Sequence, residues 1–213
     1  MIKLYTYFQS SASYRVRIAL NLKNIPAEMI YVNLVKGEHR TVDYAAINPE
    51  MIVPTFIDDG KILSQSLAIL EYLEETHPVP ALLPSEPFAR AYVRGLSYTI
   101  SSDTAPITNL KVRKYIAGTL KQPENAVAEW MRYWMDVGLA SFEKVLARSS
   151  HKGKFCYGDT PTMADCCLIP QIYNAHRWKC DISPYPLISG IAKECETHPA
   201  FIAAHPSKQK DAA

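Results

Sequence analysis

The sequence lacks the features that mark a membrane protein, a secreted protein or a nucleic-acid-binding protein. Its apolar runs fall well short of the roughly 18–20 residues that a membrane-spanning helix needs. The first residues contain no long apolar segment, so no secretory signal is expected. The formal net charge is only +2 and no dense run of lysine and arginine occurs, which argues against nucleic acid as the main partner. These absences favour a cytoplasmic protein.

Cysteine is scarce and poorly spaced for metal binding or cross-linking. The five cysteines all lie in the second half of the chain, and none forms a Cys-x-x-Cys pair. An odd count at this spacing favours neither a disulfide framework nor a tetrahedral zinc site. Cys166 and Cys167 fall in an apolar stretch, where buried reduced thiols are the usual case. We therefore expect structural cysteines and no metal.

The chain does have the length and composition of an ordinary two-domain globular protein. It contains 213 residues, of which 48% are hydrophobic and 21% charged, enough for two domains with their own cores. A proline-rich stretch near residues 77–87 suits a linker. We predict a first domain over residues 1–80, a linker over 81–88 and a second domain over 89–213.

The first domain alternates strand and helix signals. Apolar residues at helical spacing over 14–23 separate the first two of four short strand candidates. The strand candidates are residues 3–7, 30–35, 53–57 and 61–63. Asp58-Asp59-Gly60 supplies hairpin turn chemistry between the last two, and a helix follows from about residue 65. This order predicts a thioredoxin-like α/β domain, in which the first two strands pair in parallel and the hairpin is antiparallel.

The second domain shows no convincing strand signal and is predicted to be all-helical. The helix candidates are residues 89–100, 112–120, 124–147 and 163–177. Within 124–147, apolar residues recur at i, i+3, i+4 and i+7, which predicts a core-facing stripe. That stripe is Val127, Trp130, Met131, Trp134, Val137 and Gly138.

Three short motifs in the first domain allow both a structural and a functional interpretation. Ser10-Ser11-Ala12-Ser13 precedes the first helix, where a serine caps the free amides but a hydroxyl can also donate to a bound thiolate. Val53-Pro54 either marks the start of a strand or is the cis proline common at this place in thioredoxin-like domains. A cis bond there turns the amide and carbonyl of Val53 toward an extended peptide ligand.

The third motif is Gln65-Ser66 at the start of a predicted helix. Ser66 is the obvious candidate for a helix cap. A helix N-terminus also binds anions, and a ligand carboxylate would suit it. The two interpretations remain open on the residues of this motif alone.

Taken together, these motifs resemble the signature of the zeta class of glutathione transferases, which includes the maleylacetoacetate isomerases and the maleylpyruvate isomerases. The likeness runs through essentially the whole chain. The residues that carry it are FQSSASYRVRIAL (residues 8–20), Asn48-Pro49, Val53-Pro54-Thr55, QSLAILEYLE (65–74), Ala81-Leu82-Leu83-Pro84, GDTPTMAD (158–165), Pro170-Gln171, Arg177, Pro184-Tyr185-Pro186 and His205-Pro206.

The resemblance implies the cytosolic glutathione transferase fold, glutathione as cosubstrate and a homodimer. It implies that Ser11 donates to the glutathione sulfur, and that Ser10 and Arg15 support that loop. Val53 would pair with the cysteinyl unit through its backbone beside Pro54. Gln65 and Ser66 would hold the γ-glutamyl end, and residues 162–165 would cap a helix of the second domain.

On the substrate side, Arg177 and Gln9 are the residues that the resemblance points to. The planar fork of Arg177 suits a substrate carboxylate, although a surface or interdomain ion pair is the competing interpretation. Many family members have arginine where this chain has Gln9, and cysteine where it has Ala12. Glutamine or histidine is common at the position of Ala105. The loss of a cation at Gln9 leaves a small carboxylate-bearing substrate less firmly specified, and Lys111, Arg113 or His176 could compensate.

Three functions follow as hypotheses. The first is glutathione-dependent cis–trans isomerisation of maleylacetoacetate in tyrosine and phenylalanine catabolism, with the maleylpyruvate reaction as its near alternative. The second keeps glutathione but conjugates or dehalogenates small electrophiles such as α-halo acids, and Gln9 motivates it. The third is a non-catalytic binding module, since fold alone does not fix function; Ser11 and Gln65-Ser66 argue against it.

Overall fold

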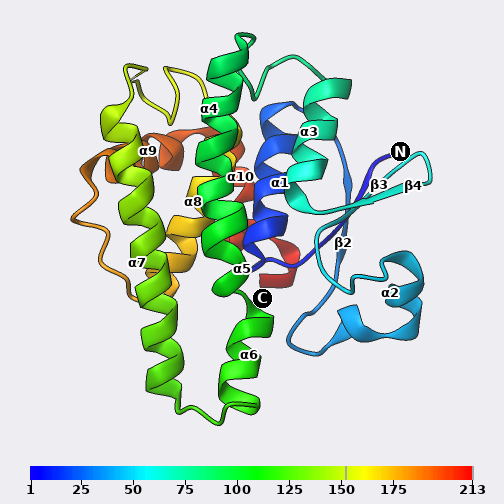
Figure 1. Cartoon of the computed structure of the whole chain (residues 1–213). Coiled ribbons are helices and arrows are strands. Elements are labelled where there is room, and N and C mark those ends of the chain that lie inside the picture. Colours follow the sequence, from blue (N-terminus) through cyan, green and yellow to red (C-terminus); the bar gives the residue numbers. More distant parts are fainter. Residues whose placement is uncertain (152, 213) are drawn as a thin grey trace. The chain divides into compact units, whose positions relative to one another are not determined.

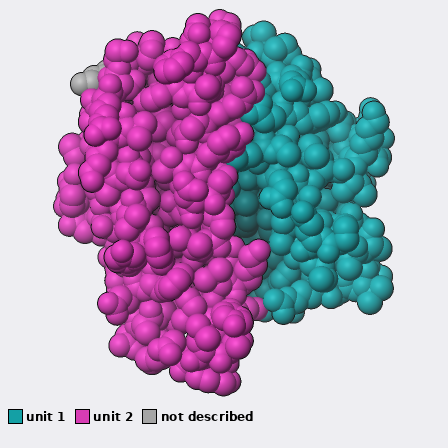
Figure 2. Space-filling model, in the orientation of Figure 1, with its two compact units in different colours: residues 1–82, 197–213 teal, residues 83–196 magenta. Residues whose placement is uncertain are grey.

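The computed structural model describes residues 1–151 and 153–212, which form two compact units. Residues 1–82 and 197–213 make up unit 1, and residues 83–196 make up unit 2 (Figure 2). Unit 1 thus includes the end of the chain, whereas the predicted boundaries of 1–80 and 89–213 leave that segment with the second domain. Among the described residues, no helix is both long and apolar enough to cross a membrane.

Unit 1 is built on a four-stranded mixed sheet in the order β2-β1-β3-β4. The strands are β1 (Lys3–Thr6), β2 (Glu28–Tyr31), β3 (Thr55–Asp58) and β4 (Lys61–Ser64). β1 and β2 are parallel, because a helix connects them, while β3 is antiparallel to both β1 and β4. This confirms the predicted thioredoxin-like arrangement and its hairpin.

Four helices complete unit 1, together with three short 3₁₀ turns. The helices are α1 (Ser11–Leu22), α2 (Val42–Ile47), α3 (Ser66–Thr76) and α10 (Pro199–Ala204); the 3₁₀ turns are η1 (Glu38–Arg40), η3 (Pro206–Lys208) and η4 (Lys210–Ala212). α1 packs against both α3 and α10 (Figure 1). Its Val16, Ile18 and Ala19 and the Ile69 and Leu70 side chains of α3 are fully buried. The helical spacing of these apolar residues is what seats both helices in the core.

A buried ion pair ties the end of α1 to α3 and to the segment that follows it. The side chain of Lys23 is 0% exposed, and its Nζ donates to Glu74 Oε2 at 2.9 Å. The same ammonium donates to the carbonyls of His77 at 2.6 Å and Pro80 at 2.8 Å. Glu74 Oε2 also accepts from the amide of Leu82 at 2.8 Å. All three protons of the ammonium are therefore used, which is the condition under which a buried charge is tolerated.

All the regular secondary structure among the described residues of unit 2 is helical. It contains α4 (Pro87–Tyr98), the π-helical turn η2 (Thr99–Thr104), α5 (Ala105–Ile107), α6 (Leu110–Gly118), α7 (Glu124–Arg148), α8 (Met163–Arg177) and α9 (Pro186–Thr197). The all-helical prediction is confirmed. Helices α9 and α10 were not predicted, because each begins at a proline in a segment that was interpreted only through its motifs.

The predicted core stripe on α7 is only partly correct. Val127, Met131 and Gly138 are buried, but Trp130 is 37% exposed and Val137 is 42% exposed. The indole Nε1 of Trp130 donates to the carbonyl of Ile107 at 2.8 Å, so its polar end is satisfied at the surface. The buried face is instead continued by Met135, Leu139 and Phe142.

Helix α8 begins with a complete capping box. The carboxylate of Asp165 accepts from the amide of Thr162 at 2.7 Å and from the amide of Cys156 at 2.9 Å, and the Thr162 side chain caps in return. Burial raises the pKa of Asp165. The predicted structural role of residues 162–165 is confirmed. Cys166 and Cys167, on the same helix, are buried and take part in no disulfide among the described residues, as expected.

Candidate functional site

Residues 7–13, which lead from the end of β1 into the first turn of α1, are called the serine loop here, and Ser10 and Ser11 have different roles in it. Ser10 is the N-cap of α1: it has extended backbone angles, and its side chain accepts from the amide of Ser13 at 3.2 Å. Ser11 is the first residue of the helix and is half-buried. Its hydroxyl forms no hydrogen bond with any other residue that the structure describes. Because Ser10 caps the helix, the Ser11 hydroxyl is left available at the positive end of α1.

Arg15 links α1 to the start of α3. Its Nη1 donates to the Ser66 hydroxyl at 3.1 Å, and both side chains are buried. These residues lie 51 positions apart in the sequence. A buried cation is thereby held beside the N-terminus of α3, where it adds to the positive end of the helix dipole.

Gln65, not Ser66, is the N-cap of α3, so the cap suggested for Ser66 is wrong. Gln65 makes no capping bond with its side chain, and its Nε2 donates instead to the Glu50 carboxylate at 3.1 and 3.2 Å. Its φ of 68° lies in a region that residues other than glycine rarely occupy. Strained backbone of this kind is concentrated at ligand sites. The amides of the first turn of α3 thus carry no side-chain cap in the described structure and can receive an anion.

Val53 presents its backbone rather than its side chain. The Val53-Pro54 peptide bond is cis and directly precedes β3. The Val53 side chain joins a buried cluster with Tyr7, Val32 and Tyr44. Neither its amide nor its carbonyl takes part in a hydrogen bond within residues 1–151 and 153–212. These two groups are those that an extended peptide would pair with.

A network that was not predicted braces the loop around Val53. Asn48 Nδ2 donates to the Thr55 hydroxyl at 2.8 Å and to the Ile52 carbonyl at 3.1 Å. The Tyr44 hydroxyl donates to the same carbonyl at 2.6 Å, and burial raises the pKa of Tyr44. In the sequence, Asn48-Pro49 was only one of the motifs that carry the family resemblance, with no structural role assigned to it. The only available signal was an asparagine seven residues before a threonine, which has no local meaning.

The sheet brings these features to one end of unit 1. Tyr5 lies opposite Thr55 in the antiparallel pair, so β3 begins where β1 ends. The serine loop follows β1 directly, and Arg15 joins α1 to Ser66. The end of β1, the start of α1, the start of β3 and the start of α3 therefore share one edge of the domain (Figure 1). The predicted residues of unit 1 are assembled as a group.

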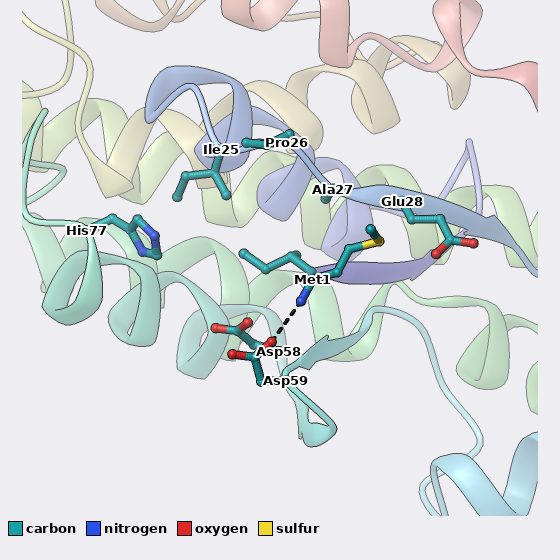
Figure 3. Close-up of a pocket in the computed structure, with 9 residues that line it drawn as sticks. Met1, Ile25, Pro26, Ala27, Glu28, Asp58, Asp59 and His77 are labelled. Carbon is teal, nitrogen blue, oxygen red and sulfur yellow. Dashed lines mark hydrogen bonds and ion pairs between the residues drawn. The ribbon is translucent and has the colours of Figure 1, made fainter.

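A cavity of about 510 Å³ lies at the opposite end of the same sheet (Figure 3). Its lining residues are Met1, Ile2, Ile25, Pro26, Ala27, Glu28, Asp58, Asp59 and His77. Two of these residues form an ion pair, in which the amino group of Met1 lies 2.8 Å from Asp59 Oδ1. None of the predicted site residues lines this cavity, since it sits where β1 begins rather than where it ends.

The predicted substrate-side residues fall in different units. Gln9 lies in the turn that precedes Ser10 in unit 1. Arg177 ends α8 in unit 2, where it is exposed; its Nη1 donates to Asn174 Oδ1 at 3.4 Å, and its guanidinium lies 6.0 Å from the Tyr173 ring centre. In the same unit, the Arg113 guanidinium lies 5.3 Å from the ring centre of Trp178, the residue after Arg177. Two arginines thus gather at the C-terminal end of α8.

Both halves of the chain match models of the same family. Residues 1–75 match the glutathione S-transferase N-terminal domain, and residues 110–205 match the glutathione S-transferase C-terminal domain. The maleylacetoacetate isomerase of Rhizobium meliloti is 45% identical over 207 residues, which cover 97% of each chain. The chain belongs to the zeta class of the glutathione transferases.

Solved structures of zeta-class enzymes agree with the whole fold. The holo structure of a maleylpyruvate isomerase, a bacterial zeta-class transferase, has a TM-score of 0.96 and 42% identity, covering 99% of this chain and 100% of that one. The maleylacetoacetate isomerase of Methylobacterium extorquens AM1, solved with malonate and glutathione bound, has a TM-score of 0.96 and 39% identity, with 99% of each chain covered. The family and fold predicted from the sequence are confirmed, and membership of this class makes the protein a glutathione-dependent enzyme.

Proposed function

We propose that this zeta-class transferase is a glutathione-dependent cis–trans isomerase that converts maleylacetoacetate to fumarylacetoacetate. The observation that carries the proposal is the free hydroxyl of Ser11 at the N-terminus of α1, with Ser10 in the capping role. The relatives named maleylacetoacetate isomerase support the choice of substrate. The proposal includes a place in tyrosine and phenylalanine catabolism, a cytoplasmic location and a homodimer.

The residues of unit 1 fit glutathione group by group. The Val53 amide and carbonyl can pair with the cysteinyl unit, as a strand pairs with an extended peptide. The uncapped first turn of α3, with Gln65 and Ser66, can hold the γ-glutamyl carboxylate. The Ser11 hydroxyl can donate to the sulfur, which favours the thiolate over the thiol. Arg15 fixes Ser66 and adds positive charge near the same helix end.

For this reaction the protein has two main tasks: it must stabilise the thiolate and orient the substrate. When bound, glutathione supplies a nucleophile whose reversible addition turns the cis alkene into a single bond that can rotate, and its elimination leaves the trans alkene. Ser11 lowers the free energy of the charged sulfur. Arg177 clamps a substrate carboxylate through its planar fork, and Gln9 is the residue of unit 1 that contacts the substrate. Arg113, beside Trp178, supplies a second cation in unit 2 and offsets the charge that Gln9 does not carry.

The direct test follows the absorbance of maleylacetone with and without glutathione. A rate that requires glutathione is expected from the purified chain. Maleylpyruvate and an α-halo acid serve as comparison substrates in the same assay. If neither maleylacetone nor maleylpyruvate is isomerised and the halo acid is conjugated fast, the isomerase proposal is replaced by the second hypothesis, conjugation or dehalogenation of small electrophiles.

Maleylpyruvate is the second candidate substrate. The observation that favours it is the structural match to a maleylpyruvate isomerase at a TM-score of 0.96 with 42% identity. Both substrates contain a cis alkene conjugated to a carbonyl and end in a carboxylate, so the roles of Ser11 and Arg177 are the same. The ratio of kcat/KM for the two substrates decides between them.

Replacing Arg177 by alanine is expected to raise KM for the carboxylate substrate by about tenfold, the cost of one charge-assisted hydrogen-bonded contact. KM for glutathione should stay within about threefold of the wild-type value, because the residues proposed to bind glutathione lie in unit 1. Arg177→Lys should recover only part of the loss, since lysine cannot bind a carboxylate in a bidentate manner.

The matched control is Arg148→Ala, an exposed arginine at the end of α7. It removes the same charge without changing the end of α8, and wild-type constants are expected. Equal effects of the two substitutions on KM would assign the Arg177 effect to net charge and remove the clamp from the proposal.

A further inference from the structure

The backbone of Phe8, in the serine loop, is held at both its amide and its carbonyl by charged side chains from outside the loop. Its amide donates to Asp211 Oδ2 at 2.9 Å, and its carbonyl accepts from Arg17 Nη2 at 3.1 Å. The next turn of the loop is closed by the Ser10 amide, which donates to the Tyr7 carbonyl at 3.0 Å. The contact with Asp211 joins residues 203 positions apart.

Arg17 is a buried cation that organises the end of β1. Its side chain is only 1% exposed. Nη1 donates to the Thr6 hydroxyl at 3.0 Å and to the Tyr7 carbonyl at 3.3 Å, and Nε donates to the Ala204 carbonyl at 3.1 Å. The guanidinium therefore connects the last residue of β1 and the two residues after it to the last part of the chain. A fork of fixed donors is suited to this role in a way that an ammonium is not.

The C-terminal segment is anchored to α1 at further points. Asn21 Nδ2 donates to the Ala200 carbonyl at 3.0 Å. The rings of Tyr14 and His205 meet edge to face, with centres 6.2 Å apart. The segment thus runs along α1 (Figure 1). Its hydrogen bond from the Phe8 amide places Asp211, in η4, against the residues that precede Ser10.

We infer that Asp211 is a positioning residue for the thiolate-stabilising loop, through the Phe8 amide that it holds. This rests on the proposed function, since it is the glutathione sulfur that Ser11 would serve. Ser10 and Ser11 follow Phe8 by two and three residues, so a shift of that peptide moves the cap and the donor together. Charge-assisted hydrogen bonds to a backbone amide are among the stronger ones in proteins, and this one closes the loop from a distant part of the chain.

The Asp211 carboxylate also places a negative charge near a site that must stabilise a second negative charge, the thiolate of glutathione. Its second oxygen, Oδ1, is buried and has no hydrogen-bond partner in the part of the chain that the structure describes. An asparagine could supply the same acceptor to Phe8 without that charge. If holding the peptide is the role of Asp211, the neutral amide should replace it; if the charge itself acts, it should not.

The test compares Asp211→Ala, Asp211→Asn and the neighbouring control Lys210→Ala in the full chain. Lys210 is exposed in the same turn, so its removal perturbs the segment without touching Phe8. Two readouts are needed. One is the ultraviolet absorbance of the thiolate of bound glutathione as a function of pH, which requires no second substrate. The other is the pair of constants, kcat and KM for glutathione, with maleylacetone.

Asp211→Ala is expected to raise the pKa of the bound thiol by about 1 and to lower kcat at neutral pH about tenfold, the loss of one charge-assisted hydrogen bond. KM for glutathione should change less than about threefold, because Val53 and the start of α3 are untouched. The rate should return toward the wild-type value as pH rises, since the thiolate then forms without help. Asp211→Asn and Lys210→Ala should titrate like the wild type.

An unchanged thiol titration in Asp211→Ala overturns the inference, and so does an Asp211→Asn variant that is impaired as much as the alanine one. A merely less stable protein would lower kcat without moving the titration, which also counts against it. Failure of the proposed function has a different signature: the wild-type chain itself then shows no glutathione-dependent isomerisation. In that case the binary-complex titration still tests Asp211.

Discussion

Ser11→Ala is expected to lower kcat of the glutathione-dependent reaction by about 10²-fold. This is the typical cost of removing one hydrogen-bond donor that stabilises an anion, here the thiolate of bound glutathione. The hydroxyl has no capping task of its own, because Ser10 caps α1. KM for glutathione should change by less than about threefold, since the other contacts are made by backbone groups of Val53 and α3. The measurement is steady-state kinetics with maleylacetone over a range of pH.

The pH dependence identifies the cause of that loss. A hydroxyl that donates to the sulfur stabilises the charged form, so it lowers the thiol pKa, and its removal raises that pKa. At a fixed pH below the wild-type pKa, a rise of about 2 in the thiol pKa reduces the thiolate fraction about 10²-fold, which accounts for the expected loss of kcat. The limb of the rate profile that rises with pH should therefore move to higher pH in Ser11→Ala.

Two neighbouring substitutions serve as controls for Ser11. Ser11→Thr keeps a hydroxyl and should retain most of the lowering of the thiol pKa. Ser10→Ala removes the cap and should reduce the free energy of unfolding by about 1 kcal/mol, which Ser11→Ala should not do. A Ser11→Ala enzyme with wild-type kcat and pH profile would transfer the donor role to another group of the loop.

Lys23→Met is expected to reduce the free energy of unfolding by about 3–5 kcal/mol, because it leaves a buried charge without its partner. Of its two contacts, Glu74 Oε2 would keep the one with the Leu82 amide and lose the one with Lys23. The carbonyls of His77 and Pro80 would lose their hydrogen-bond donor. Urea unfolding followed by far-ultraviolet circular dichroism measures the change, with equal slopes as the condition for comparison.

A double-mutant cycle separates the ion pair from the loss of packing. Glu74→Gln keeps an acceptor for Leu82 while removing the charge. The double variant should be more stable than the sum of the two single losses predicts, with a coupling of about 2 kcal/mol. The control is Lys114→Met, which removes an exposed lysine of α6 and should change stability by less than about 0.5 kcal/mol. Additive losses in the cycle would show that the pair contributes through packing alone.

The local chemistry of the chain was enough to predict the order of strands and helices in the first domain. Two separated strands with a helix between them favour a parallel pair, and Asp58-Asp59-Gly60 favours a tight turn. Apolar periodicity likewise located α4, α6, α7 and α8. It was wrong about Trp130 and Val137 on α7, because periodicity indicates which residues are apolar and not which face has a neighbour to cover it.

Within the site, the motifs identified the right segments but not the division of roles inside them. The sequence allowed any serine of the loop to be the cap, and it favoured Ser66 as the cap of α3. The structure assigns the first cap to Ser10 and the second to Gln65, and it pairs Ser66 with Arg15. Each of these assignments depends on backbone angles and on a partner from another helix, neither of which a local pattern contains.

The sequence by itself determined the fold class, the family and the segments that form the glutathione site, because these follow from periodicity, turn residues and short motifs. Only the tertiary structure decided what holds the serine loop in place. Arg17 would be expected at the surface from its charge, yet it is buried against the loop, and Asp211 reaches Phe8 from the other end of the chain. A hydrogen bond between residues so far apart produces no local pattern in the sequence, because the two residues become neighbours only when the chain folds.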